Sequence, residues 1–143
     1  MLRSASTRGY KTFIELKQKY PDYTFFTANN LREYDYYPET LPQLYFYKED
    51  EYGERTEYML DIFTNDMFFY IKKRIDQYLE HYGDGEWKRK QYPTIMFIVP
   101  DSRLKAKATK YFNESRDNVY ADEEDIPFKI ITATALKNIN TVI

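Results

Sequence analysis

The chain has 143 residues, which is the size of one ordinary domain and enough for a core that needs neither metal nor disulfide. Its formal net charge is −2, from 21 basic and 23 acidic residues, so the chain as a whole is not a polycation, and any contact with nucleic acid has to come from a local patch. Cysteine is absent, which excludes disulfides, thiol catalysis and cysteine metal sites, and suits a reducing compartment.

The first twenty residues are predicted to hold a lead-in and a helix. Residues 1–8 are small, polar and basic, which is typical of a flexible lead-in or of a linker. Apolar residues at helical spacing predict a helix over residues 10–20, with Ser6 or Thr7 as its cap and Pro21 as its stop.

Three strands are predicted next. Residues 23–28 are rich in β-formers and predict a strand that breaks at Asn29-Asn30. The acidic, tyrosine-rich segment 31–40 is predicted to be a loop over one end of the sheet. Residues 41–48 and 57–63 are two further strand-like runs, and the short glycine-containing turn between them can join only antiparallel neighbours.

The clearest helical pattern in the chain follows the third strand. Apolar side chains recur there at three- and four-residue steps, while charged side chains occupy the other face. The apolar positions are Phe68, Ile71, Ile75, Tyr78, Leu79 and Tyr82. Thr64, Asn65 or Asp66 is the predicted cap, and residues 83–85 are the predicted end. This connection is long enough to join two parallel strands, the second being the strand-like run 93–100, in which residues 95–99 are continuously apolar.

The C-terminal part adds a second helix and a last strand. Asp101 or Ser102 is predicted to cap the helix, residues 121–125 form an acidic loop, and residues 128–133 form the strand before a short tail from Ala135. The resulting order is helix, three strands, helix, strand, helix, strand. It predicts one α/β domain over residues 1–143, an α+β mixed sheet with helices on both faces.

Aromatic residues are unusually frequent, at 19% of the chain with 16 tyrosines and 10 phenylalanines. A tyrosine can bury its ring while its hydroxyl stays hydrated or bonded, so one interpretation is packing at the edge of the core or at an interface. The alternative is a stacking surface for bases or for a partner protein, because aromatic residues near lysine and arginine also hold single-stranded nucleic acid.

Four short segments carry a family resemblance. They are residues 41–43 (Leu-Pro-Gln), 60–64 (Leu-Asp-Ile-Phe-Thr), 74–78 (Arg-Ile-Asp-Gln-Tyr) and 97–103 (Phe-Ile-Val-Pro-Asp-Ser-Arg). In this order the chain resembles the PD-(D/E)XK nuclease-like fold, also called restriction-endonuclease-like, with its αβββαβ core. Within that group it resembles the nuclease-like domain of plasmid replication-relaxation proteins. Those proteins carry an upstream winged-helix DNA-binding domain, so the resemblance implies that this chain is an isolated C-terminal domain.

The resemblance implies a metal site at the ends of the hairpin strands. Carboxylates there hold Mg²⁺, a hard ion that takes oxygen ligands, and a nearby lysine positions or activates the attacking water. The first acidic position is Gln43 in this chain, the second is Asp61, and the lysine position is Phe63. A neutral amide is a poor Mg²⁺ ligand, and a phenylalanine can neither bind metal nor move a proton.

Two replacements would restore a nuclease. Asp35 or Glu39 would supply the missing carboxylate, and Arg74 or Lys73 would stand in for the lysine. Arg74 stays protonated, so it would stabilise a phosphorane instead of acting as a base. One interpretation therefore makes Asp61 and Arg74 the catalytic residues of an active Mg²⁺-dependent nuclease. The interpretation we favour is that Asp61 is a strand-end acid without catalytic part, in a protein that uses neither metal nor cofactor.

Other enzyme classes find no motif here. His81 is the only histidine, and we expect it to be exposed at the end of its helix without a metal-binding or acid–base role. The four glycines form neither a phosphate-binding loop nor a nucleophile elbow.

Basic side chains gather on the two long helices and on the link that follows the first one. If both helices pack on one face of the sheet, these groups converge and can bind DNA phosphates in a salt-sensitive, sequence-independent way. The candidate nucleic-acid-binding residues are Lys72, Lys73, Arg74, Lys88, Arg89, Lys90, Arg103, Lys105 and Lys107, with Lys110 as a further member. The alternative is that lysine-rich helix faces are simply solvated, as in many soluble proteins.

The favoured hypothesis is a catalytically degenerate nuclease-fold accessory module in plasmid or mobile-element DNA replication or mobilisation. Its expected partners are DNA, replication or mobilisation proteins, or a second copy of the chain. The alternatives are an active nuclease and a protein-interaction or dimerisation module that uses exposed Tyr and Phe. The sequence shows no signal peptide and no apolar run of about 18 residues, so we expect a cytoplasmic protein without a membrane partner.

Overall fold

The protein folds around a mixed five-stranded sheet. The structure, a computed structural model, describes residues 2–64, 67–89, 91–120 and 126–136. In chain order the elements are α1 (Leu2–Lys19), β1 (Thr24–Thr27), α2 (Ala28–Leu31), β2 (Leu44–Glu49), β3 (Arg55–Ile62), α3 (Phe68–Asp84), β4 (Thr94–Val99), α4 (Ser102–Tyr120), β5 (Phe128–Thr132) and α5 (Ala133–Leu136). The predicted α/β class is confirmed, and so is the predicted order of the long helices and the strands.

The strands lie in the order β1-β2-β3-β4-β5. The pairs β1–β2 and β2–β3 are antiparallel, whereas the pairs β3–β4 and β4–β5 are parallel, so the predicted hairpin and the predicted crossover are both present. Gly53, at φ +79°, forms part of the hairpin turn in a conformation that favours glycine. The crossover helix α3 ends at Gly85, also left-handed at φ +66°, as the glycine-rich sequence predicts.

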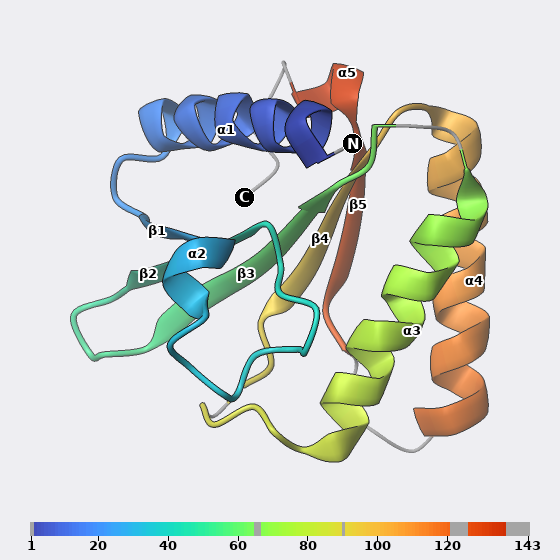
Figure 1. The fold of residues 1–143 in the computed structure, drawn as a ribbon. Coiled ribbons are helices and arrows are strands. Elements are labelled where there is room, and N and C mark those ends of the chain that lie inside the picture. The colour runs from blue at the N-terminus through green and yellow to red at the C-terminus, as the bar shows by residue number, and fades with distance from the viewer. Residues whose placement is uncertain (1, 65–66, 90, 121–125, 137–143) are drawn as a thin grey trace.

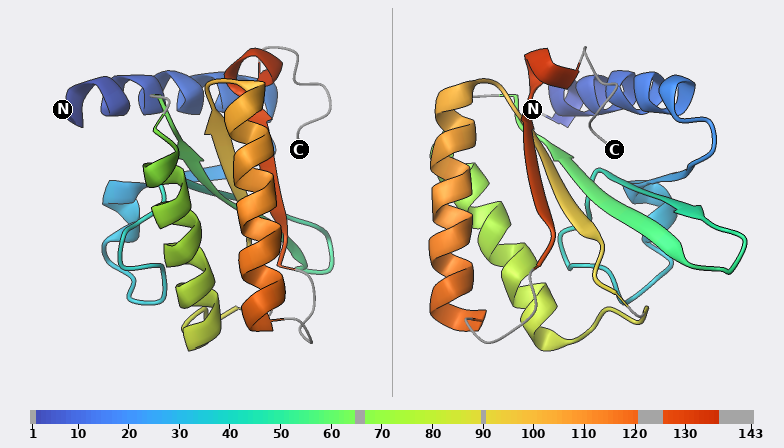
Figure 2. Two further views of the ribbon diagram at one scale, coloured as in Figure 1. Left: turned by 90° about the vertical axis from the view of Figure 1, so that its right-hand side faces the viewer. Right: turned by 180° about the vertical axis from the view of Figure 1, so that it is seen from behind.

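Helices cover both faces of the sheet. α3 and α4 lie side by side on one face, and α1 crosses the other (Figures 1 and 2). Side chains alternate along β3 accordingly, with Met59 packed beneath α3 and Leu60 packed beneath α1. In β4, Phe97 and Ile98 are buried on opposite faces, which explains why this strand appears in the sequence as an unbroken apolar run.

The N-terminal part differs from the sequence prediction in two places. α1 begins at Leu2, so residues 2–8 are helical and do not form a flexible lead-in; Ser6 and Thr7 lie inside the helix. No proline occurs there, so nothing in the sequence stops the helix earlier. The expected break at Asn29-Asn30 is the one-turn helix α2, because the Asn30 carboxamide accepts the Thr27 backbone N–H at 3.0 Å.

The ends of the later helices are partly as predicted. Asp101 caps α4, accepting the Leu104 N–H at 2.9 Å. α3 instead has Met67 as its N-cap, without a side-chain hydrogen bond. The alternative caps Asn65 and Asp66, Lys90 and the acidic segment 121–125 lie outside the described residues. A one-turn helix, α5, starts at Ala133, where a tail was predicted. Within the described residues, a helix with the length and apolar character needed to span a bilayer is not found.

Candidate functional site

The carboxylate at the end of β3 is joined to a guanidinium of α3. Asp61 lies two residues after Met59, so its side chain leaves the sheet on the face that α3 covers. Arg74 Nε donates to Asp61 Oδ2 at 3.0 Å, and Arg74 Nη2 lies 3.4 Å from Asp61 Oδ1. The two residues are 7% and 6% exposed, so this ion pair is buried. Arg74 follows Ile71 by three residues and precedes Tyr78 by four, and this spacing is the sequence signal that places it on the buried stripe of α3.

Three further groups complete this network. The Tyr78 hydroxyl donates to Asp61 Oδ2 and accepts from Arg74 Nη2 at 3.0 Å. Arg74 Nη1 donates to the Thr40 carbonyl oxygen at 2.8 Å and to Gln77 Oε1 at 3.0 Å. Every nitrogen of the guanidinium therefore has a hydrogen-bond acceptor within the protein.

Gln43 and Phe63, which stand at the acid and lysine positions of the family resemblance, both have structural contacts. Gln43 Oε1 accepts the Ile62 N–H at 2.8 Å, and the Gln43 backbone N–H lies 3.4 Å from Asp61 Oδ1, so this residue ties the start of β2 to the end of β3. The ring of Phe63 packs edge-on against Phe97, with 4.9 Å between the ring centroids.

The electrostatics of the network favour fixed protonation states. Burial alone would lower the pKa of Arg74, but the neighbouring Asp61 carboxylate and Tyr78 hydroxyl raise it above its ordinary value. Burial, followed by the negative charge of Asp61, raises the pKa of Tyr78 well above its ordinary value. Arg74 therefore stays charged and Tyr78 stays protonated near neutral pH, so neither is suited to act as a general base.

The donor set at the end of β3 does not suit Mg²⁺. The oxygens of Asp61 already accept hydrogen bonds from Arg74 and Tyr78. A metal ion would have to displace the Arg74 guanidinium, which is itself a cation. Of the candidate replacement acids, Asp35 pairs with Lys88 at 3.4 Å. Among the residues that the structure describes, no group of three or more histidine and acidic side chains could hold a metal ion.

His81 is buried, at 4% exposure, and the expectation of an exposed histidine is wrong. It lies three residues after Tyr78, on the same buried side of α3. Its Nε2 lies 2.9 Å from the Tyr36 carbonyl, which can only accept, so Nε2 carries the proton and Nδ1 accepts from the Tyr92 hydroxyl at 2.6 Å. Burial lowers the pKa of His81, which keeps the ring neutral. Beside it is a pocket of about 270 Å³, whose lining includes the other candidate replacement acid, Glu39.

A second buried carboxylate was missed by the sequence analysis. Glu57 of β3 is 7% exposed, accepts a hydrogen bond from the Tyr45 hydroxyl and lies 3.5 Å from Arg89 Nε. Burial raises the pKa of Glu57, against the opposing effects of Tyr45 and Arg89. Glu57 lies four residues before Asp61 on the same face of the strand, and this spacing is the sequence signal that it is buried. The same spacing places the two carboxylates roughly 13 Å apart along the strand. That separation is too large for one shared ion.

The basic faces of α3 and α4 adjoin. Lys72 of α3 holds its Nζ 5.2 Å from the ring centroid of Tyr111 in α4, and Lys107 of α4 holds its Nζ 5.4 Å from the ring centroid of Phe68 in α3. Each lysine thus reaches across to the opposite helix. The Tyr111 hydroxyl also donates to Asp76 of α3 at 2.7 Å. Both helices pack on the same face of the sheet, which was the condition for the basic groups to converge.

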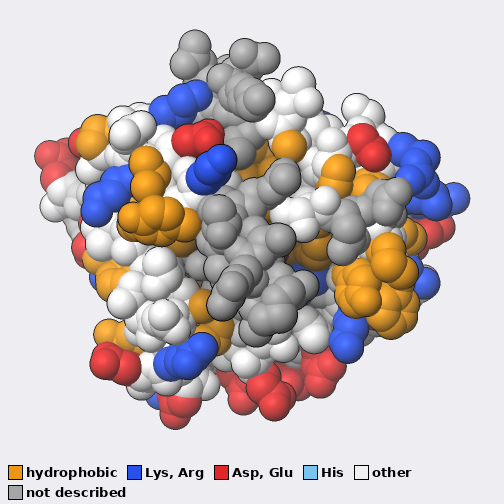
Figure 3. Space-filling model, turned by 45° about the horizontal axis from the view of Figure 1, so that its top comes forward, with side chains coloured by type: hydrophobic (Ala, Val, Ile, Leu, Met, Phe, Trp, Pro, Cys, Tyr) orange, Lys and Arg blue, Asp and Glu red, His pale blue; other side chains and the backbone are white. Residues whose placement is uncertain are grey.

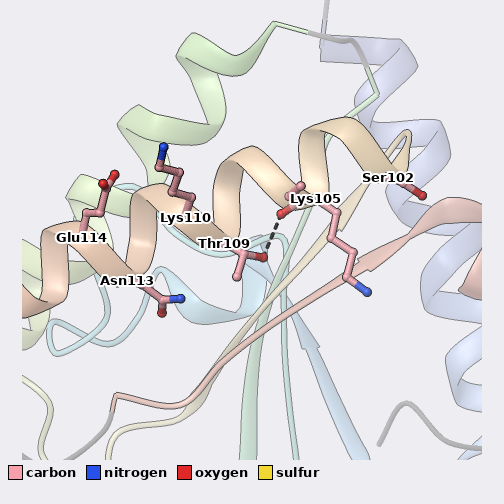
Figure 4. A pocket seen from close by; sticks show the side chains of 7 residues that line it. Ser102, Lys105, Thr109, Lys110, Asn113 and Glu114 are labelled. Carbon is pink, nitrogen blue, oxygen red and sulfur yellow. Dashed lines mark hydrogen bonds between the residues drawn. The ribbon is translucent and has the colours of Figure 1, made fainter.

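The remaining basic residues of α4 divide between its two sides. In Figure 4, Lys110 extends from α4 toward α3, whereas Lys105 extends toward β5. The two lysines line a hollow of about 510 Å³ on the outer side of α4, together with Ser102, Ala106, Thr109, Asn113 and Glu114. We therefore define the α3–α4 surface as the exposed side chains Lys72, Lys73, Arg103, Lys107 and Lys110, and leave Lys105 outside it.

Other members of the predicted basic set lie elsewhere. Arg74 is buried in the ion pair with Asp61. Lys88 pairs with Asp35, and Arg89 pairs with Glu57, both on the link beyond the C-terminal end of α3. Because α3 has 17 residues, it separates this link from the start of the helix by roughly 25 Å.

A scan against protein-family models finds no match, and searches of curated proteins and of solved structures find none either.

Proposed function

We propose that the chain is a catalytically degenerate nuclease-fold accessory module that binds DNA through the α3–α4 surface. One observation carries the binding part of this proposal: the two basic helices pack side by side, and Lys72 and Lys107 each reach an aromatic ring on the other helix. The family resemblance supplies the biological setting, which is replication or mobilisation of plasmid or mobile-element DNA with partner proteins of that process.

The Asp61–Arg74 pair supports the part of the proposal that excludes cutting. A nuclease of this fold needs free carboxylate oxygens for Mg²⁺ and a group that activates water. Asp61 instead neutralises a buried arginine, and the positions that would complete the site are Gln43 and Phe63. The chain is therefore expected to bind DNA without cleaving it.

Charge explains why the α3–α4 surface suits DNA in a chain of net charge −2. Five exposed cations lie on the neighbouring faces of two helices, and the Asp76 carboxylate beside them accepts a hydrogen bond from Tyr111. Phosphates that bind such lysines and arginines release counterions from the DNA, and the affinity then falls steeply as salt is raised.

The test is duplex binding by fluorescence anisotropy with a matched pair of variants. Lys73→Ala/Lys107→Ala removes two charges from the α3–α4 surface, while Lys11→Ala/Lys17→Ala removes two from exposed positions of α1 on the opposite face of the sheet. We expect the first variant to bind roughly tenfold more weakly at constant low salt and the second to bind like the wild type. Equal losses in both variants, or no binding of the wild type at low salt, would contradict the proposal.

The non-cutting part has its own assay. Supercoiled plasmid and single-stranded circles are incubated with the protein in Mg²⁺ and in Mn²⁺, and we expect no nicks. Cleavage that disappears in Asp61→Ala, at a temperature at which circular dichroism shows this destabilised variant to be folded, would show that the active-nuclease alternative is correct and this part of the proposal wrong.

A further inference from the structure

Three large apolar side chains are exposed at the start of α3. Met67, Phe69 and Tyr70 are 52%, 61% and 49% exposed. The rings of Phe69 and Tyr70 contact each other edge-on, with 5.4 Å between their centroids. Large apolar side chains gathered at one exposed place mark a binding surface more often than isolated ones do.

The packing of α3 does not require these exposed rings. Phe68, between Met67 and Phe69, packs against the core and meets Tyr111 of α4 edge-on at 6.3 Å between ring centroids. The helix is then held by Ile71 and the apolar residues that follow it at helical spacing. Phe69 and Tyr70 point away from this contact, so the fold leaves two adjacent aromatic faces without a partner in the core.

Cations lie next to this aromatic pair on α3 and on the side that adjoins α4. Lys73 follows Phe69 by four residues and Tyr70 by three, so it lies one helical turn from both rings on the outer side of α3. Lys72 and Lys107 lie at the contact between α3 and α4. Figure 3 shows a hydrophobic patch on the right of the view, where α3 begins, with lysine and arginine side chains on its border.

We infer that Phe69 and Tyr70 stack against unpaired bases of a single-stranded nucleic acid whose phosphates bind Lys73 and Lys107. This inference rests on the proposed DNA-binding function and specifies the form of nucleic acid that the α3–α4 surface takes. Every base has a π-face that can stack on an aromatic ring, while the lysines follow the phosphate backbone. The bases of a duplex are already stacked on one another, so a duplex can use the lysines but not the rings.

Charge complementarity favours this occupant over an apolar protein surface. A strand of nucleic acid presents flat bases and anionic phosphates along one line, and the start of α3 presents aromatic rings next to cations in the same arrangement. A purely apolar partner would cover the rings and leave the neighbouring lysines in a poorly hydrated border without counter-charge.

The experiment compares three variants for binding to oligothymidylate, to oligouridylate of equal length and to a duplex. Phe69→Ala/Tyr70→Ala removes both rings, and Phe69→Leu/Tyr70→Leu keeps apolar bulk but removes the π-faces. Tyr10→Ala/Tyr52→Ala is the matched control, because these two tyrosines are 63% and 82% exposed elsewhere on the molecule. Urea unfolding midpoints establish that each variant is folded.

We expect the Ala and the Leu variants both to lose roughly fivefold or more in affinity for single strands, and to keep the wild-type affinity for the duplex. The control variant should bind all three probes as the wild type does. The two single-stranded probes show whether the surface prefers DNA or RNA.

Three results would overturn the stacking inference without overturning the proposed function. In the first, the Ala variant binds single strands as the wild type does while Lys73→Ala/Lys107→Ala binds all DNA more weakly; the DNA-binding proposal then stands and the stacking inference fails. In the second, the Leu variant retains full affinity, which shows that apolar bulk and not stacking matters. In the third, sedimentation shows a wild-type dimer that the Ala variant abolishes without any change in single-strand affinity, which assigns the aromatic pair to a second copy of the chain. If no nucleic acid binds the wild type at low salt, the proposed function fails together with the inference.

Discussion

Lys73 and Arg74 are neighbours in the sequence and face opposite environments in the fold. The helix turns by about 100° per residue, so Arg74 points into the protein and Lys73 points into solvent. Arg74 is held by Asp61, Tyr78 and two further acceptors, whereas Lys73 lies exposed beside the aromatic pair of α3. Two adjacent cations thus belong to different parts of the molecule, one to the buried ion-pair network and one to the α3–α4 surface.

The difference shows why residue type alone does not identify a site. The resemblance to nucleases draws attention to Asp61, but both oxygens of its carboxylate already accept hydrogen bonds from other groups of the protein. The outer side of α3 and α4 instead presents exposed cations such as Lys73 to solvent. The predictions below separate these regions, since changes in the buried network should act on stability and changes on the surface should act on binding.

The largest effect is expected from Asp61→Ala. This substitution leaves the Arg74 guanidinium buried without its counter-charge, and removing one partner of a buried pair costs about 3–5 kcal/mol. Urea unfolding followed by circular dichroism measures the loss. The matched control is Asp35→Ala, which breaks an exposed pair with Lys88 and should cost at most about 1 kcal/mol.

A double-mutant cycle tests whether the Asp61 effect comes from the pair. Asp61→Ala/Arg74→Ala removes both charges, so it should be less destabilised than the sum of the two single variants. A loss for Asp61→Ala no larger than that for Asp35→Ala would mean that the network does not support the fold, and the structural interpretation of Asp61 would then be wrong.

Tyr78→Phe should have the next largest effect. It removes a buried hydroxyl that donates to Asp61 and accepts from Arg74, and leaving such partners unsatisfied costs about 1–3 kcal/mol. Tyr111→Phe is the matched change at a partly exposed hydroxyl, which bonds to Asp76, and it should shift the free energy of unfolding by no more than about 0.5 kcal/mol. Equal shifts in the two variants would remove the contrast between the buried network and the surface.

Asp101→Ala should cost about 1 kcal/mol, because it removes the N-cap of α4 and leaves the Leu104 N–H without its acceptor. Ser102→Ala at the next position should be close to neutral. Thermal or urea unfolding of the two variants side by side gives the comparison. A neutral Asp101→Ala would show that the start of α4, which carries Arg103 of the surface, is not fixed by this cap.

The smallest expected effect is a pH dependence from His81. Its folded-state pKa lies below the unfolded value of 6.5, so the unfolded chain binds the proton more readily. The contribution of His81 to stability is therefore complete above about pH 6.5 and falls as the pH drops through and below that value. Unfolding midpoints of wild type and His81→Gln across this range measure it, and the variant should lack this part of the slope.

The raised pKa of Glu57 acts on stability in the opposite direction. The stability contributed by this carboxyl is lost as the pH rises above the ordinary pKa of a glutamate, near 4.5.

The main features of the fold could be predicted from the sequence because they depend on local patterns. The unbroken apolar run at 95–99 indicated a strand buried on both faces, and the amphipathic segment before it indicated a crossover helix. The cap of α4 could be narrowed to Asp101 or Ser102 from their place before an apolar-periodic run, and the structure selects Asp101. The start of α1 was not recognisable, because a polar segment without proline fits a helix as well as it fits a lead-in.

The candidate site was less predictable because it depends on which side of a helix each charge occupies. By residue type Arg74 belongs with the exposed cations, but its spacing from Ile71 and Tyr78 places it on the buried face. A histidine near the end of a charged helix is likewise expected to be exposed, but the position of His81 three residues after Tyr78 places it on the buried side. The partners of Lys88 and Arg89 come from segments distant in sequence, so only the structure brings Asp35 and Glu57 to them. By contrast, the convergence of the basic groups depends only on α3 and α4 packing on one face of the sheet, and the two helices do pack side by side there (Figures 1 and 2).

The most direct test of the account is the salt dependence of duplex binding by wild type and by Lys73→Ala/Lys107→Ala. If these two lysines bind phosphates, the slope of the logarithm of affinity against the logarithm of salt concentration should be shallower in the variant by about two, roughly one per lost contact. The same plot for Lys11→Ala/Lys17→Ala should superimpose on the wild type. Parallel plots for wild type and Lys73→Ala/Lys107→Ala would contradict the claim that the α3–α4 surface holds the DNA backbone.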